Sequence, residues 1–169
     1  MPIVANPVAY KVLPPHTSEA ADAVTLLPTR AALLERIAEL TPASADAPAA
    51  LVLVGLLRRD DGWPIPGSIL GELTSVLASA IRADDWLARS GPTEFAVIFE
   101  GTAEAAEAAA TRLIAAVSAQ GIPGMSAAAG LAGLSGDVTG SEVHRRATLC
   151  LAAARSIGGG QVIKYSGTR

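Results

Sequence analysis

Arg82 and Asp85 are the two residues whose types and spacing point most directly to chemistry. An Arg guanidinium can donate a pair of hydrogen bonds to O6 and N7 of guanine, and a carboxylate can accept from the N1 and N2 donors. At the end of a helix, residues three apart lie on the same side of the chain. Together the pair could read both edges of one guanine. The alternative, which the residues taken alone favour, is a surface ion pair worth under about 1 kcal/mol.

A helix, a turn and two strands must position this pair. The stretch from Pro66 or Gly67 to Arg82 is predicted to be a helix with an apolar stripe, formed by Ile69, Leu73, Val76, Leu77 and Ile81. A short strand from Leu87 follows, and Gly91-Pro92 interrupts it because Gly permits positive φ and Pro lacks an N–H. Phe95 to Phe99 is a β-rich apolar run. The segment therefore predicts a β-hairpin whose tip is Ser90 to Glu94.

This hairpin resembles the signature hairpin of GGDEF domains, the diguanylate cyclase family, whose tip reads Gly-Gly-Asp-Glu-Phe. Here the tip reads Gly91-Pro92-Thr93-Glu94-Phe95. The family's product-inhibition motif, Arg-x-x-Asp, ends five residues before the signature, and Arg82 and Asp85 stand at that spacing. The resemblance implies that these two residues bind cyclic di-GMP.

Three further residues are candidates for the same site. In the family another Arg from the following helix contributes to it, and Arg112 stands at that place within about a residue. Trp86 is a candidate for stacking on a base, although packing of its strand is the competing interpretation. Arg89 stands where the family commonly carries an Arg, and it is a candidate either for a ligand contact or for a structural role.

The other elements resemble the family in their order. We predict a helix to Leu40 capped by Thr29, a central strand over Ala50–Leu57, a helix from Thr102 to about Gln120, a helix from Ser141 as cap to about Ser156, and a last strand over Gln161–Tyr165. Met125 to Leu134 is rich in Ala and Gly, so only the resemblance makes it a strand. The predicted fold class is α+β, a palm with a mainly antiparallel sheet covered by helices. The resemblance covers roughly residues 22 to 165.

The resemblance also implies which chemistry is missing. Joining two GTP molecules requires a divalent ion held by carboxylates. The family's ligands are an Asp at the end of the central strand and the third residue of the signature, and Gly55 and Thr93 stand at these places. Only Glu94 remains. We therefore expect no catalysis, no metal site and no cofactor.

The loop from Arg58 to Pro66 is the remaining route to a catalytic site. It is about five residues shorter than the family's guanine-binding loop and lacks its Asn. With a different alignment of this loop, Asp60 or Asp61 would approach the catalytic position. That is the alternative to complete loss of catalysis.

Composition limits the other classes of function. The net charge is −3 without a block of Lys or Arg, which argues against a nucleic-acid or anionic-membrane surface. The single Cys150 and the lack of a leader or a spanning apolar run favour a cytoplasmic protein.

His16 and His144 have no Cys/His cluster around them, and we expect His144 on a solvated helix face. Residues 1–20 are predicted to be a Pro-rich arm or linker, and 21–169 one domain.

These observations lead to three hypotheses. The first is a catalytically inactive GGDEF-like domain that acts as a cyclic di-GMP receptor and transmits the signal by homodimerisation or through an unidentified protein partner. The second is a scaffold of the same fold that binds no nucleotide. The third, ranked last, is an enzyme with residual cyclase or GTP-binding activity.

Overall fold

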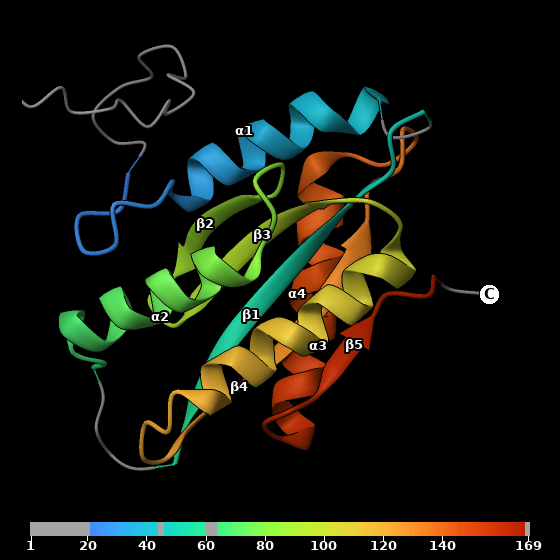
Figure 1. The fold of residues 1–169 in the computed structure, drawn as a ribbon. Coiled ribbons are helices and arrows are strands. Elements are labelled where there is room, and N and C mark those ends of the chain that lie inside the picture. Colours follow the sequence, from blue (N-terminus) through green and yellow to red (C-terminus); the bar gives the residue numbers. More distant parts are fainter. Residues whose placement is uncertain (1–20, 44–45, 60–63, 168–169) are drawn as a thin grey trace, which may run out of the picture.

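The computed structural model describes residues 21–43, 46–59 and 64–167, and this part of the chain forms a five-stranded sheet with helices on both faces (Figure 1). In chain order the elements are α1 (Arg30–Leu40), a 3-10 turn η1 (Thr41–Ala43), β1 (Ala49–Arg58), α2 (Gly67–Ala80), β2 (Trp86–Gly91), β3 (Glu94–Glu100), α3 (Ala103–Ala119), β4 (Met125–Gly133), α4 (Gly140–Ile157) and β5 (Val162–Lys164). The predicted order and the α+β class are confirmed. The predicted arm over residues 1–20 lies outside the described residues.

The strands are ordered β2-β3-β1-β4-β5. β1 pairs antiparallel with β3 and with β4, β2 pairs antiparallel with β3, and β5 alone runs parallel to its neighbour β4. The mainly antiparallel sheet is therefore as predicted. β1 is buried along most of its length because it is flanked by strands on both sides and by helices on both faces.

Alternation along β1 divides the core into two layers. Val52 and Val54 face a cluster that includes the buried residues of α2 and α3, whereas Leu51 and Leu53 face a cluster with those of α1 and α4. Full burial of each such side chain contributes roughly 1.5–3 kcal/mol. Figure 1 shows α2 and α3 in front of the sheet and α4 behind it. None of the helices in the described ranges combines the length and apolarity needed to cross a bilayer.

β4 is a strand despite its weak β-propensity. Ala127, Ala128, Ala129 and Ala132 are fully buried between the flanking strands and helices. Small side chains let α4 approach the sheet closely, and Gly130 is the closest point: a Cβ there would collide with the backbone of α4, at Leu151 N and 2.5 Å from Ala147 O. Packing between layers therefore selects Ala and Gly here and overrides propensity.

Several predicted boundaries differ locally from the structure. α2 ends at Ala80, so Arg82 lies beyond the helix instead of closing it. Thr139, not Ser141, caps α4: its Oγ1 accepts a hydrogen bond from Glu142 N, because Thr139 has extended backbone and Ser141 already lies in the first turn. Thr29 does precede α1, but its side chain makes no capping hydrogen bond.

The close approach at Gly130 gives a paired stability prediction. Gly130→Ala should lower the free energy of unfolding by about 1–3 kcal/mol, because the α4 backbone would have to move. The matched change Gly71→Ala in α2, where an added Cβ meets nothing within 4 Å, should raise it by about 0.5–1 kcal/mol. Urea unfolding of both variants measures this. Equal effects would show that the contact between β4 and α4 does not depend on the missing side chain.

Candidate functional site

The β2–β3 hairpin has a shorter tip than predicted. β2 continues to Gly91, the register shifts between Arg89 and Gly91, and β3 begins at Glu94. The turn is therefore Pro92-Thr93 alone. Pro92 suits this turn because its φ is fixed and because it has no N–H that would need a partner.

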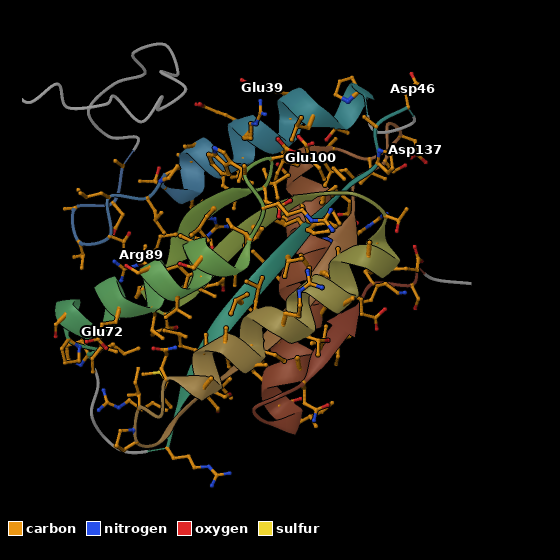
Figure 2. The ribbon with its side chains drawn as sticks, in the orientation of Figure 1. Glu39, Asp46, Glu72, Arg89, Glu100 and Asp137 are labelled. Carbon is orange, nitrogen blue, oxygen red and sulfur yellow. The ribbon has the colours of Figure 1, made fainter. Side chains whose placement is uncertain are left out.

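The side chain of Arg89 ties the hairpin to the loop before α1. Its Nη1 lies 2.9 Å from Asp22 Oδ2, its Nη2 donates to the carbonyl of Pro92 at 2.9 Å, and its Nε donates to the carbonyl of Gly91 at 3.3 Å. Figure 2 shows Arg89 beside this N-terminal loop. The guanidinium is committed to these contacts, an arrangement that suits the structural role weighed for it.

Asp22 is the anionic partner in this link. Burial raises the pKa of its carboxyl, but hydrogen bonds from the Thr25 hydroxyl and N–H, together with the charge of Arg89, outweigh burial and lower the pKa to about 2. The carboxylate therefore stays ionised and keeps the ion pair with Arg89 through the neutral and mildly acidic range.

Arg82 and Asp85 lie in the turn between α2 and β2, and the structure brings them together. Asp85 Oδ2 accepts from the backbone N–H of Arg82 at 2.9 Å, and Oδ1 accepts from the N–H of Glu100 at 3.2 Å. The carboxylate thus closes its own turn and fastens it to the end of β3. Each oxygen keeps a lone pair for a further donor. The exposed guanidinium of Arg82 lies 5.6 Å from the centre of the Phe99 ring.

The two other candidates take separate positions. Arg112 is exposed on α3, which covers the same face of the sheet as α2, and within the described residues it makes neither a hydrogen bond nor an ion pair. Trp86 is half-buried and packs against the core cluster shared with α1 and α4. Within the described residues, Trp86 forms no side-chain hydrogen bond or ion pair with Arg82 or Asp85.

The catalytic positions of the family come together at the other end of the hairpin. Gly55 of β1 pairs directly with Glu94 of β3, and the Thr93 carbonyl accepts from the N–H of Leu56 at 2.8 Å. Glu94 accepts a hydrogen bond from the Ser90 hydroxyl at 2.7 Å. The residues here do not fit a divalent ion, because Gly55 supplies no side-chain oxygen ligand and a Cβ at this position would lie 2.5 Å from the guanidinium of Arg155. The described residues contain no group of three or more His, Cys, Asp or Glu side chains that could hold a metal.

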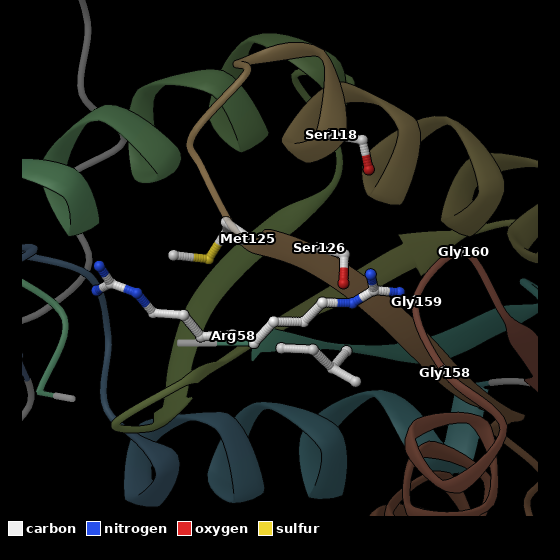
Figure 3. Close-up of a pocket in the computed structure, with 10 residues that line it drawn as sticks. Arg58, Ser118, Met125, Ser126, Gly158, Gly159 and Gly160 are labelled. Atoms are coloured by element: carbon white, nitrogen blue, oxygen red, sulfur yellow. The ribbon is translucent and has the colours of Figure 1, made fainter. Parts of the chain in front are cut away.

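A hollow of about 520 Å³ opens where β1 ends and β4 begins, near the turn after α4. Figure 3 shows Arg58, Ser118, Ser126 and the glycines of Gly158–Gly160 around it. A Cβ at Gly159 would collide with the Ser126 side chain. Any side chain at position 159 therefore needs Ser126 to move. Asp60 and Asp61, the alternative catalytic carboxylates, lie outside the described residues.

His144 is buried, which corrects the expectation of a solvated face. Only 8% of the residue is exposed, because α4 turns this position inward beside Val143, and its Nε2 has no partner among the described residues. Burial, then the charge of Arg30, lowers the pKa of His144, while Glu94 acts in the opposite direction. A hollow of about 490 Å³ lies beside it, between α4 and the hairpin tip. The sequence offered no signal for it, since its neighbours Arg145 and Arg146 are charged.

The family model for the GGDEF domain of diguanylate cyclases matches residues 19–159. The chain belongs to the GGDEF domain family. No curated protein matches it.

Solved GGDEF structures share the fold. The GGDEF domain of FimX from Pseudomonas aeruginosa is 26% identical, with a TM-score of 0.70 over 85% of this chain and 98% of that one. The GGDEF domain of DgcB from Caulobacter crescentus, solved in complex with cyclic di-GMP, is 18% identical, with a TM-score of 0.75 over 90% and 96%. Diguanylate cyclase SiaD from P. aeruginosa, solved with its activator SiaC, is 23% identical, with a TM-score of 0.75 over 86% of this chain and 62% of that one.

The ion pair of Asp22 with Arg89 predicts a pH-dependent loss of stability in Asp22→Asn. The pKa of Asp22 is lower in the folded state than its unfolded value of about 3.9, so its contribution is present above about pH 4 and disappears as the pH falls through about 2. Partial exposure reduces the full linkage value, and we expect a loss of about 1–2 kcal/mol at pH 7.

Urea unfolding at several pH values measures this loss. The difference between wild type and Asp22→Asn should shrink towards zero as the pH is lowered from about 5 to about 2. Asp46→Asn, in an exposed turn before β1, is the matched control and should leave stability unchanged. A loss for Asp22→Asn that stays constant with pH would contradict the electrostatic origin.

Proposed function

We propose that this GGDEF domain is a catalytically inactive receptor for cyclic di-GMP, and that Arg82 and Asp85 carry the recognition. The single observation that supports this most is the turn after α2. Asp85 is held by two backbone N–H groups, while the guanidinium of Arg82 is exposed beside it. Residues 21–169 form the receptor domain in this proposal, with 1–20 as a linking arm.

The chemistry of the ligand matches this turn. A guanine presents O6 and N7 to the guanidinium of Arg82 and N1–H and N2–H₂ to the carboxylate of Asp85. The remaining lone pairs of Asp85 can accept these donors without breaking the turn. Arg112, free of other partners within the described residues, contributes a positive charge for a phosphate of the ligand. Trp86 and Arg89 rank lower, since the first is half-buried against the core and the second is tied to Asp22.

Loss of catalysis rests on the ligand positions for a divalent ion. One carboxylate, Glu94, remains where Gly55 and Thr93 replace oxygen ligands, and it already accepts a hydrogen bond from Ser90. Two-substrate phosphoryl chemistry without a metal clamp lacks the main source of charge neutralisation. Ligand binding and catalysis are thus separable, because the two sets of residues lie at opposite ends of the hairpin strands.

Output through protein contact is the second part of the proposal. Leu149 and Ile157 of α4 are 52% and 64% exposed, and we take them as the candidate contact residues. These residues also support the competing function, a scaffold that binds a protein partner or a second copy without any nucleotide. Binding of cyclic di-GMP discriminates between the two functions.

Calorimetric titration with cyclic di-GMP, with GTP plus Mg²⁺ in parallel, tests the receptor. We expect micromolar or tighter binding of cyclic di-GMP and no heat with GTP. Arg82→Ala should weaken binding about 10- to 100-fold, the value of a lost bidentate contact to guanine, with little change in thermal stability because the side chain is exposed.

Arg36→Ala is the matched control, since it removes a partly exposed arginine, paired with Glu39, from α1 on the other side of the sheet. It should leave the affinity unchanged. Arg112→Ala should weaken binding less than Arg82→Ala and should reduce its dependence on salt. Absence of heat with cyclic di-GMP would contradict the receptor function and favour the scaffold function. Heat with GTP that requires metal and is lost in Glu94→Ala would support the hypothesis of residual enzyme activity.

A further inference from the structure

The hollow of about 490 Å³ between α4 and the hairpin tip is lined by buried polar side chains. Of the residues that the structure describes, three polar or charged ones are buried, and two of these, Ser90 and His144, line this hollow. The third, Thr41, lies elsewhere and donates its hydroxyl to the carbonyl of Ile37. Buried polar groups are the informative exceptions in a protein interior, and the volume suits a small molecule. Two of them at one hollow therefore indicate a binding site.

The less exposed lining residues offer hydrogen-bond acceptors. Half-buried Glu94 accepts from the Ser90 hydroxyl through Oε1 at 2.7 Å, and within the described residues its Oε2 accepts no hydrogen bond. His144 Nε2 also lacks a partner there. Burial, then the charge of Arg30, lowers the pKa of His144, so its ring is neutral at pH 7 and has one acceptor nitrogen. The ring can turn about its Cβ–Cγ bond, a torsion with broad wells, to direct that nitrogen into the hollow.

The edge of the same hollow carries a free positive charge. Arg30, the first residue of α1, is exposed and forms neither a hydrogen bond nor an ion pair within the described ranges. Arg145, the other arginine of the lining, donates from Nε and Nη2 to the two carboxylate oxygens of Glu142, each at 2.7 Å. Arg30 is therefore the guanidinium that can take up a carboxylate from outside the chain.

An apolar surface completes the lining. Leu149 of α4 is 52% exposed, and Pro92 at the hairpin tip is exposed as well. The hollow thus combines acceptors in its less exposed part with a free cation and an apolar surface at its edge. A molecule that matches all three needs a donor group such as an ammonium, a carboxylate and a short apolar portion.

We propose that this hollow binds a small α-amino acid with an apolar side chain. Glu94 and His144 accept hydrogen bonds from the ammonium group of the ligand. Arg30 binds its carboxylate, and Leu149 packs against its side chain. The proposal goes beyond cyclic di-GMP recognition and does not rest on it, because none of these residues belongs to the turn after α2.

Calorimetric titration with L-leucine and with L-phenylalanine tests the proposal. We expect saturable binding of at least one of them. Analogues that lack one group, 2-phenylethylamine without the carboxylate and 3-phenylpropionate without the ammonium, should bind at least tenfold more weakly than L-phenylalanine, because each loses a hydrogen bond to a charged group. Absence of binding by both amino acids would overturn the proposal. So would equal binding of the analogues, since the hollow would then recognise only apolar surface.

Variants place the binding at this hollow. Arg30→Gln and Glu94→Gln should each weaken amino-acid binding at least tenfold, and His144→Phe should weaken it while keeping a ring at this position. Arg145→Gln is the matched control, because it removes a lining charge that Glu142 already compensates, and it should leave the affinity unchanged. Arg30 is exposed, so Arg30→Gln should fold normally, as thermal unfolding without amino acid would show. Unchanged affinity in Arg30→Gln would contradict the proposal. Its affinity for cyclic di-GMP should be that of the wild type, which separates failure here from failure of the receptor.

Discussion

The fold depends on one buried strand that is paired on both sides. β1 forms antiparallel ladders with β3 and β4, and its alternation sends Leu51 and Leu53 to one layer of helices and Val52 and Val54 to the other. A shift of one residue would exchange the two faces, so the register is strongly specified. That register sets Gly55 opposite Glu94 and also directs Gly55 towards α4. The geometry around Gly55 and Glu94 is thus a direct consequence of how the core is packed.

The hairpin separates the two groups of residues that we considered as candidate sites. One end carries Arg82 and Asp85, held by bonds to the backbone of their own turn and of β3. The other end carries Glu94, the tip and the ion pair of Arg89 with Asp22. Substitutions at the second end leave the contacts of the first intact. In the proposed receptor, residues at the tip can therefore change while the turn of Arg82 and Asp85 stays in place.

Sequence reasoning captured the elements whose patterns are local. The apolar run of β1 and the helical stripe around Leu73 and Leu77 were enough to define a strand and a helix. It did not capture features that depend on a neighbouring layer. Nothing near His144 in the sequence shows that α4 turns it inward, and the Ala-rich β4 owes its state to close helix packing around Gly130. The contact between Arg155 and Gly55 joins residues a hundred positions apart, so spacing could not reveal it.

The two hydrogen bonds of Asp85 have a consequence for the entropy of association. In the proposed receptor, a carboxylate already immobilised by the N–H groups of Arg82 and Glu100 would have little rotamer freedom left to lose on binding a base. Only the exposed arm of Arg82 has to be ordered, at a cost of about 0.5–1.5 kcal/mol for one flexible side chain. The turn is thus preorganised on its acceptor side and adaptable on its donor side.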